Sequence, residues 1–324
     1  MHAVTIREDG GPDVLEWAEV PDPVAADGQV LIEVAAAGVN RADIQQRKGF
    51  YPPPPGAPAY PGLECSGTIA ALGAGVTGWS VGDEVCALLP GGGYAERVAV
   101  DAGTVLPVPA GVSLVDAAAL PEVACTVRSN VGHVARLSAG EVLLVHGGGS
   151  GIGTFAIQYA RAVGAVPYAT ARAAKHAALR ELGAEAVFDY TATDFVAELS
   201  AATDGHGADV ILDHIGMAYL ERNLASLARN GRLAIIGFQG GYAGELDLRL
   251  LMGRCTSVSV TGLRARPLDE KAAIVADVRE AVWPLVADGL IRPVVYRRVP
   301  MADAAGAQRL MESNDHTGKI LLVR

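Results

Sequence analysis

Cysteines and aromatic residues are scarce in this 324-residue sequence. The four cysteines stand far apart with no paired spacing, and phenylalanine, tryptophan and tyrosine together make up 5% of the chain. Structural zinc lobes and disulfide frameworks need closely grouped cysteines, so the sequence excludes the first and gives no reason to expect the second. We expect Cys65, Cys86, Cys125 and Cys255 to be small buried hydrophobic residues.

An excess of positive charge and long apolar segments are also missing. With 26 lysines and arginines against 36 acidic residues, the formal net charge is −10. Nucleic-acid binding and polybasic membrane contact both need a basic surface, so neither is expected. No run approaches the roughly 18 apolar residues of a membrane-spanning helix. The first six residues read as a strand and not as a signal peptide, so we expect a cytoplasmic protein.

Glycine and apolar residues, in contrast, are abundant. There are 39 glycines, and hydrophobic residues make up 50% of a chain long enough for two domains. In the first third, short apolar runs at 30–35, 67–72 and 83–88 predict strands separated by turn residues. Residues 51–55, a tyrosine followed by four prolines, must be extended. This part predicts a β-rich, partly barrel-like domain.

From Ser113 onward, strands alternate with helices, which is typical of a parallel sheet. Strands are predicted at 142–145, 166–170, 186–189, 209–213 and 232–236, with a sixth, edge strand at 257–261. The helices between them are predicted at 151–163, 174–182, 194–202 and 220–228. This order predicts a doubly wound α/β sheet. A helix at 269–287 and a strand at 319–323 close the chain, and we infer that they return to the first domain.

A glycine-dense turn at 147–153 joins the first of these strands to its helix. Residues without a Cβ let the backbone approach a pyrophosphate, which then rests on the N–H groups and positive dipole end of the helix. The strand–turn–helix context predicts a dinucleotide site, although a plain tight turn is the alternative. The expected contacts are Gly148, Gly149, Ser150, Gly151, Ile152 and Gly153.

The end of the second strand indicates which dinucleotide would bind. NAD-preferring sites carry an acidic residue there for the ribose hydroxyls. In this chain the strand ends at Thr170, and Arg172 and Lys175 follow with no acid between them. The two cations predict NADPH, whose 2′-phosphate they would contact. Alternatively, they only cap and solubilise the next helix.

Several separate stretches carry a family resemblance over nearly the whole chain. They are residues 37–43 (AGVNRAD), 49–56 (GFYPPPPG), 88–95 (LLPGGGYA), 118–122 (AALPE), the glycine turn and 318–320 (GKI). Together they resemble the medium-chain dehydrogenase/reductase superfamily, its quinone oxidoreductase branch, and most closely the p53-inducible subgroup. The resemblance implies a GroES-like catalytic domain at 1–118 and 266–324, interrupted by a Rossmann-type dinucleotide-binding domain at 119–265.

The zinc alcohol dehydrogenases of the same superfamily differ from this chain at their metal ligands. Where they have a cysteine, this chain has Asn40, and where they have the histidine of Gly-His-Glu, it has Leu63. An amide and a hydrocarbon do not supply the ligands that tetrahedral zinc requires, so no metal is expected. The quinone oxidoreductase signature has glycine at the position of Ser150, although the most similar subgroup also carries serine there.

Asn40 and Tyr51 are the candidate catalytic residues. Asn40 resembles the polar residue that the family places near the nicotinamide ribose and substrate; the alternative is an Asx turn into the following helix. Tyr51 could stack on a quinone and donate its phenolic proton to the developing oxyanion; the alternative is a packed surface aromatic. Ser150 or Thr126 could frame the nicotinamide amide, or simply make ordinary turn and helix hydrogen bonds.

The remaining cofactor contacts follow from position in the family pattern. They are Thr170, Tyr190 near the adenosine phosphate, and Phe238, Gln239 and Leu263 beside the nicotinamide half. His214 could act as a base, but a loop-lining role is favoured, and His146 is expected to be structural.

Three functional hypotheses follow, of which the leading one is an NADPH-dependent, zinc-independent quinone oxidoreductase. Reduction of α,β-unsaturated carbonyls is the alternative within the fold, because a fold does not fix the substrate. A protein that holds NADPH without turnover is the third. The family pairs the edge strand at 257–261 across a two-fold axis, which implies a homodimer; coverage of that strand by residues 262–267 is the alternative.

Overall fold

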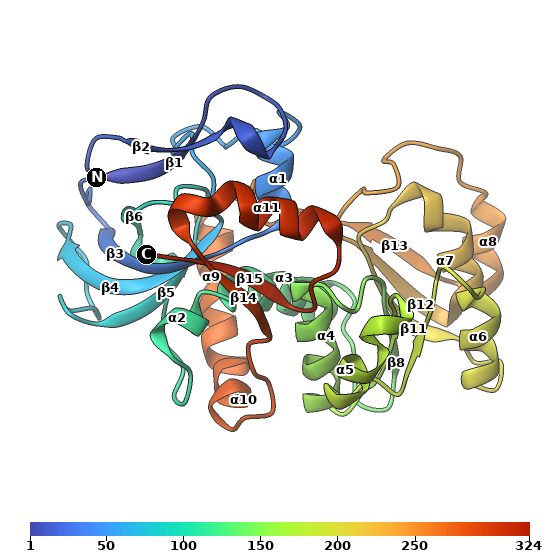
Figure 1. The fold of residues 1–324 in the computed structure, drawn as a ribbon. Helices are drawn as coiled ribbons and strands as arrows, with labels where there is room; N and C mark the ends of the chain where they lie inside the picture. The colour runs from blue at the N-terminus through green and yellow to red at the C-terminus, as the bar shows by residue number, and fades with distance from the viewer. The chain divides into compact units, whose positions relative to one another are not determined.

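The computed structural model describes residues 1–324 and divides the chain into two compact units (Figure 1). Unit 1 comprises Met1–Cys125 and Leu263–Arg324, and unit 2 comprises Thr126–Gly262. The predicted boundaries, 118/119 and 265/266, lie a few residues from these. Unit 2 is therefore inserted into unit 1, and its sheet is an α/β sheet of the Rossmann type, as the sequence predicted.

Unit 1 is built on a seven-stranded, mostly antiparallel sheet. Its order is β14-β15-β3-β4-β5-β7, and β6 pairs with β3. The strands are β3 (Gln29–Gly38), β4 (Glu64–Leu72), β5 (Glu84–Leu88), β6 (Arg97–Asp101), β7 (Val105–Pro107), β14 (Val295–Pro300) and β15 (Lys319–Val323). A separate antiparallel pair joins β1 (His2–Ile6) to β2 (Leu15–Glu19).

The C-terminal strand explains how the two ends of the sequence share one unit. β15 pairs antiparallel with β3, placing Leu321 opposite Gly38 and Leu322 opposite Ala37. Alternate residues of β3 are buried, which is the pattern of a strand with one face on a core. The inferred return of the chain's tail to the first domain is therefore seen in the sheet itself.

The helices of unit 1 lie around this sheet. They are α1 (Arg41–Arg47), α2 (Leu114–Ala117), α3 (Pro121–Val127), α9 (Leu268–Ala281), α10 (Trp283–Ala287) and α11 (Ala304–Ser313). The prediction of a single helix at 269–287 is wrong, because the helix is interrupted at Val282, between α9 and α10. Pro284 has no N–H to donate inside a helix, but it fits the first turn of a new one.

Unit 2 contains a six-stranded, wholly parallel sheet in the order β10-β9-β8-β11-β12-β13. The strands are β8 (Val142–Val145), β9 (Val166–Thr170), β10 (Ala186–Phe188), β11 (Ala208–Asp213), β12 (Leu227–Ile235) and β13 (Ser257–Val260). Five of them match the predicted strands within a residue or two at each end. β12 begins five residues earlier than predicted, and residues 227–228, which were predicted as the end of the preceding helix, already belong to the strand.

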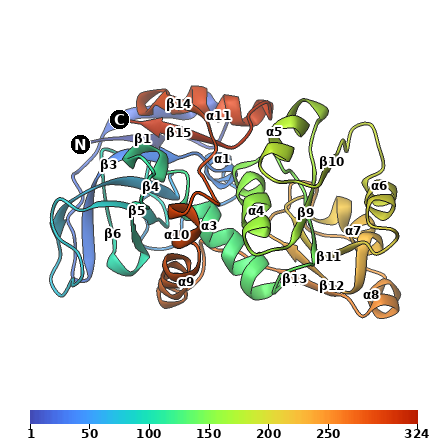
Figure 2. The same cartoon turned by 90° about the horizontal axis from the view of Figure 1, so that it is seen from below.

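Helices cover both faces of this sheet (Figure 2). α4 (Gly151–Ala162) and α5 (His176–Glu181) pack on β8, β9 and β10, whereas α7 (Leu220–Ser226) and α8 (Leu248–Arg254) pack on β12, with α6 (Phe195–Ala202) against α7. Successive residues of β9 serve the two faces: Tyr168 belongs to the core around Phe195, and Ala169 to the smaller core around Ile157. This two-sided burial explains the continuous apolar runs of the strands.

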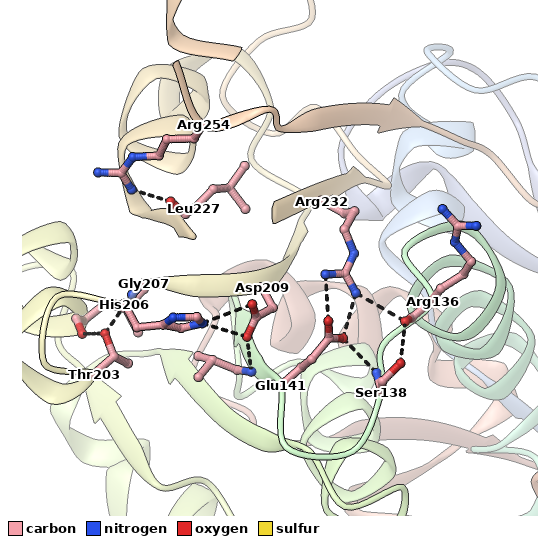
Figure 3. Close-up of polar contacts among 12 residues, drawn as sticks. Arg136, Ser138, Glu141, Thr203, His206, Gly207, Asp209, Leu227, Arg232 and Arg254 are labelled. Atoms are coloured by element: carbon pink, nitrogen blue, oxygen red, sulfur yellow. Dashed lines mark hydrogen bonds and ion pairs between the residues drawn. The ribbon is translucent and has the colours of Figure 1, made fainter. Parts of the chain in front are cut away.

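Polar contacts secure the amino-terminal ends of the parallel strands (Figure 3). Arg232 donates two hydrogen bonds to Glu141, at 2.9 and 2.7 Å, and two more to the carbonyls of Ala135 and Arg136. Asp209 accepts the N–H of Val142 at 2.8 Å and contacts His206. These bonds link the starts of β8 and β11 to each other and tie Arg232 of β12 to the residues before β8, and they leave the opposite, carboxyl edge for the glycine turn. None of the chain's helices is long and apolar enough to cross a lipid bilayer.

Candidate functional site

The glycine turn of unit 2 is closed so tightly that side chains would not fit. A Cβ on Gly153 would lie 2.4 Å from the carbonyl oxygen of Gly147, and one on Gly148 would lie 2.7 Å from the Cβ of Ala169. The turn itself is held by a bond from the Gly148 N–H to the Thr170 carbonyl at 2.9 Å. The absence of side chains here leaves backbone free to approach a ligand, which is what a pyrophosphate site needs.

Ser150 begins the helix that follows the turn. It is the N-cap of α4, and its Oγ accepts a hydrogen bond from the Gly153 N–H at 3.0 Å. The cap leaves the N–H groups of Gly151 and Ile152 without partners inside the helix, as in every first helical turn. These two N–H groups and the dipole end of the helix form an anion-binding position. Ser150 thus makes the turn bond that was the alternative to a nicotinamide contact.

A chain of hydrogen bonds between uncharged groups lies beneath the turn. The Gly147 N–H points at Thr170 Oγ1, Thr170 Oγ1 lies 3.0 Å from His146 Nδ1, and His146 Nε2 lies 2.7 Å from Asn223 Oδ1. Because an amide oxygen only accepts, Nε2 carries the proton and Nδ1 accepts from Thr170. Burial lowers the pKa of His146 to about 3, so the ring is neutral. His146 and Thr170 therefore support the turn from inside, and His146 is structural, as predicted.

The two predicted phosphate-binding cations follow β9. The Lys175 side chain lies across Gly149, since a Cβ there would be 2.5 Å from Lys175 Cδ and 3.2 Å from Nζ. Arg172 precedes the short helical turn Ala173–Lys175 and is exposed. Lys175 is thereby placed on the glycine turn. Tyr190, after β10, has 39% of its surface exposed.

The structure brings an acid to this loop that the sequence reasoning missed. Asp189, at the end of β10, accepts the N–H of Ala173 at 3.1 Å through Oδ2. Its Oδ1 accepts both the N–H and the hydroxyl of Thr191. These bonds lower the pKa of Asp189, so it is ionised. The sequence did hold a signal for this acid, because Asp189 ends the strand predicted at 186–189. In a parallel sheet the carboxyl ends of neighbouring strands lie side by side, as those of β10 and β9 do here.

The loops after β11 and β12 hold the candidates for the nicotinamide half. The Gln239 N–H donates to the His214 carbonyl at 3.1 Å, and the His214 ring covers Gly147. Phe238 has half of its surface exposed, as expected for a residue that contacts a ligand. Thr126 is buried, and its carbonyl accepts from Asn130. Leu263 is also buried, and it belongs to unit 1 and not to the predicted dinucleotide-binding domain.

Asn40, in unit 1, is the N-cap of α1 and is tied to three other groups. Its Nδ2 donates to Glu64 Oε1 at 2.9 Å and to the Gly38 carbonyl at 3.3 Å, and its Oδ1 accepts from Lys319 Nζ at 2.7 Å. Its N–H also donates to Asp43, which sits three residues on in the capping-box position. Asn40 therefore combines the predicted helix-start role with membership of a buried polar cluster.

Glu64 and Lys319 form the centre of that cluster. Both are at least 96% buried, and Lys319 Nζ lies 2.5 Å from Glu64 Oε1. Lys319 also donates to the Val39 carbonyl at 3.3 Å, and Glu64 Oε2 accepts the N–H of Glu122 at 2.9 Å. Gly38 makes room for the pair, since a Cβ there would be 2.2 Å from Glu64 Oε1. We call Asn40, Glu64, Glu122 and Lys319 the unit 1 cluster.

Tyr51 borders this cluster through a buried arginine. The Arg264 guanidinium lies 5.2 Å from the centre of the Tyr51 ring and donates to the carbonyls of Tyr51 and Pro90. It also donates to Gln46 Oε1 at 2.7 Å. Burial, and then the charge of Glu122, raise the pKa of Tyr51, so its phenol remains a proton donor at neutral pH.

One carboxyl group of the cluster, Glu122, and one beside it, Asp43, hold protons more tightly than usual. Burial raises the pKa of Glu122 to about 8, and the nearby charge of Glu64 adds to the effect. Burial also raises the pKa of Asp43 to about 6, although it accepts bonds from Asn40, Tyr94 and Gly62. Sequence reasoning missed these two residues, as well as Glu64, Lys319 and Arg264. Asp43, Glu122 and Lys319 lie within the stretches that carry the family resemblance, which was the available signal.

The unit 1 cluster does not fit a zinc ion. Of the two ligand positions of the zinc alcohol dehydrogenases, one is an amide already held by Glu64 and Lys319, and the other is the buried hydrocarbon Leu63. The ammonium of Lys319 already provides the positive charge beside the Glu64 carboxylate. Zinc prefers thiolate, imidazole and carboxylate ligands in a tetrahedron. The cluster supplies no thiolate or imidazole, and no group of three or more His, Cys, Asp or Glu side chains that could hold a metal is found in the chain.

Comparison with known proteins supports the fold of both units. Residues 26–110 match the family "Alcohol dehydrogenase GroES-like domain", and residues 151–279 match "Zinc-binding dehydrogenase". The quinone oxidoreductase of Rattus norvegicus is 31% identical over all of this chain and 98% of its own. A solved Escherichia coli quinone oxidoreductase complexed with NADPH covers both chains fully, with 28% identity and a TM-score of 0.90.

Other similar proteins are polyketide synthases, of which this chain matches only a small part, and a solved enoyl reductase that it matches nearly in full. The mycocerosic acid synthase-like polyketide synthase of Mycobacterium tuberculosis is 32% identical over 98% of this chain, which spans only 15% of that protein. The solved CurK enoyl reductase is 28% identical, with a TM-score of 0.86 over 99% of this chain and 98% of its own.

The fold and the glycine turn together define a nicotinamide-dependent oxidoreductase of two domains. More narrowly, the chain belongs to the medium-chain dehydrogenase/reductase superfamily and, within it, to the quinone oxidoreductase-like family. The resemblance to this superfamily and to its quinone oxidoreductase branch is thus confirmed.

Proposed function

We propose that this protein is an NADPH-dependent, zinc-independent quinone oxidoreductase. The observation that carries the proposal is the turn at Gly147–Gly153, where a Cβ would clash and where the Lys175 side chain lies across the backbone. Such a turn suits a pyrophosphate, and a lysine beside it suits an additional phosphate. The unit 1 cluster supports a reaction without a metal, because Lys319 already compensates the Glu64 charge.

The residues divide the work between binding and reaction. Gly151 and Ile152 would hold the pyrophosphate, Arg172 and Lys175 the 2′-phosphate, and Phe238 and Gln239 the nicotinamide half. When bound, the nicotinamide supplies a hydride. Tyr51, still protonated at neutral pH, donates a hydrogen bond to the oxygen on which negative charge develops. Asn40 presents an amide fixed by Glu64 and Lys319 to the same region of unit 1.

Reduction of α,β-unsaturated carbonyls is the second candidate. It is favoured by the similarity to an enoyl reductase and by Glu122, a carboxylic acid that holds its proton up to about pH 8. An enolate formed by hydride addition needs a proton on carbon, whereas a hydroquinone anion is a stable base. A nearby acid is therefore of more use to an enone reductase than to a quinone reductase.

Parallel assays with three acceptors test the proposal. We would follow NADPH oxidation with 1,4-benzoquinone, 9,10-phenanthrenequinone and trans-2-hexenal, and measure NADPH and NADH binding by calorimetry. Faster turnover of the quinones supports the proposal, and faster turnover of hexenal supports the second candidate. Tight NADPH binding with no oxidation by any acceptor would leave a binding protein instead.

A homodimer through β13 is a further part of the proposal. β13 is the edge of the parallel sheet, pairing only with β12, and Val260 has 58% of its surface exposed. An unpaired edge of this kind is suited to pairing with a second copy. Light scattering during size-exclusion chromatography should give twice the chain mass, and Val260→Lys should halve it. A monomeric wild-type protein would refute the dimer.

A further inference from the structure

Glu122 occupies a position in unit 1 that suits chemistry. It lies in the first turn of α3, half-buried, and its N–H is anchored to Glu64 Oε2 at 2.9 Å. The anchor ties it to the same carboxylate that fixes Asn40. Its own carboxyl group makes no hydrogen bond with the protein, in contrast to those of Asp43 and Glu64. A carboxyl group kept without partners in a half-buried position remains available to a ligand.

We propose that the Glu122 side chain is the acid that delivers a proton to the reduced substrate. The inference rests on the proposed function and deepens it, because it assigns the group that protonates the reduced acceptor. Reduction of such an acceptor adds one hydride and one proton. In this step the O–H bond of Glu122 breaks, and a C–H or O–H bond forms on the substrate anion. The Glu122 carboxylate then recovers a proton from water.

The groups around Glu122 stabilise both its protonated form and its ionised form. The groups that act on it from neighbouring elements are Asp43, Tyr51, Glu64, Arg264, Lys271 and Lys319. Burial and the negative charge of Glu64 favour the protonated form, and the pKa of about 8 keeps that form dominant at neutral pH. The cations Arg264, Lys271 and Lys319 stabilise the carboxylate left behind after transfer. An acid with a pKa near the working pH is the efficient choice for a general acid.

Tyr51 is a weaker candidate for the same step. The pKa of its phenol is raised above 10 by burial and by the Glu122 charge. The Glu122 carboxyl is thus the more acidic of the two groups, and its half-buried position lets water restore its proton. We therefore assign hydrogen bonding to the substrate oxygen to Tyr51 and proton transfer to Glu122.

Glu122→Gln tests the assignment, with Glu84→Gln on the exposed start of β5 as the matched control. Infrared spectra of the protein alone should show a protonated carboxyl band at pH 6.5 that fades as pH passes 8. Glu122→Gln should lack the part of this band that fades near pH 8 and keep only the part that fades near pH 6, which belongs to Asp43, whereas Glu84→Gln should keep both. Calorimetry should give the same NADPH affinity for all three proteins.

Turnover supplies the second measurement. With trans-2-hexenal, Glu122→Gln should lower kcat about 100-fold, the usual contribution of a general acid, and Glu84→Gln should leave it unchanged. Glu122→Asp should restore part of the loss. With benzoquinone the loss should be below about 10-fold, since solvent can protonate an oxygen anion. If Glu122→Gln misfolds, Glu122→Asp and the wild-type infrared titration still decide the question.

The outcomes separate this inference from the proposed function. An active wild type with unchanged kcat in Glu122→Gln, or a wild type with no carboxyl band that fades near pH 8, would overturn the assignment and leave the reductase intact. A wild type that binds NADPH but reduces no acceptor would instead overturn the proposed function, while the infrared titration would still report the state of Glu122.

Discussion

The glycine turn of unit 2 and the unit 1 cluster differ in their chemical character. The turn is made of backbone, and the side chains that support it, such as His146 and Thr170, are neutral. The unit 1 cluster is made of ionisable side chains, with Glu64 and Lys319 in contact at its centre. The turn must receive a charged ligand without supplying charge from beneath, whereas the cluster must manage protons. The glycine turn depends on residues without side chains, whereas the unit 1 cluster depends on charged side chains.

The pH dependence of the two regions has opposite signs. His146 has its pKa lowered from 6.5 to about 3, so the unfolded chain binds the extra proton, and its contribution to stability is lost as pH falls below 6.5. Glu122 has its pKa raised from 4.5 to about 8, so the native state binds the extra proton. Its contribution is complete below 4.5 and is lost as pH rises through 8.

Breaking the Glu64–Lys319 pair should have the largest effect. Lys319→Met leaves a fully buried carboxylate without its counter-charge, and Glu64→Gln leaves a buried ammonium. Loss of one partner of a buried pair costs about 3–5 kcal/mol. Urea denaturation should therefore show either single variant to be destabilised by that amount.

The double variant sharpens the prediction. With both charges gone, the cost in Glu64→Gln/Lys319→Met should be well below the sum of the two single costs, because no uncompensated charge remains. Strictly additive costs would show that the two groups do not depend on each other, and the unit 1 cluster would then be wrongly described.

A methyl group in the glycine turn should have the next largest effect. In Gly153→Ala the new Cβ would lie 2.4 Å from the Gly147 carbonyl oxygen, so the helix must shift. We expect about 1–3 kcal/mol of destabilisation and a large loss of NADPH affinity in calorimetry. Gly253→Ala is the control: it lies in helix α8 with nothing within 4 Å of the new Cβ, and should be neutral or slightly stabilising.

Removing the Glu122 carboxyl should flatten the stability profile on the alkaline side. The pH dependence of stability follows the difference in bound protons between the native and unfolded states. Between pH 6.5 and 8, His146 and Asp43, with its pKa of about 6, contribute less to this difference than Glu122 does. The wild-type free energy of unfolding should fall there by up to about 1.4 kcal/mol per pH unit through Glu122. Urea titrations of Glu122→Gln should show that slope removed. An unchanged slope would mean that Glu122 is ionised at neutral pH.

The two regions also differ in how much of them could be predicted from sequence. The glycine turn is one contiguous run between a strand and a helix, so local rules placed it together with β8, β9 and α4. The unit 1 cluster joins the start of α1 to β4, α3 and β15, and its residues are up to 279 positions apart. Its contacts depend on the pairing of β15 with β3, which no local pattern encodes.

Other differences have equally local causes. The predicted helix at 269–287 overlooked Pro284, which starts a second helix. Asp189 was missed because the search for an acid followed the second strand alone, whereas β10 delivers its own carboxyl end to the same edge. That acid bears directly on the choice between NADPH and NADH.

Lys175 offers the smallest and most selective test. Its side chain lies across Gly149, and the bonds that Asp189 makes to Ala173 and Thr191 occupy the acid. Lys175→Gln should therefore weaken NADPH binding about 10-fold, which is the size of one lost charge-assisted contact, and leave NADH binding unchanged. Calorimetry with both cofactors measures the ratio. An equal loss for both would place Lys175 on the pyrophosphate instead, and no loss for either would reduce it to a residue of the helix start.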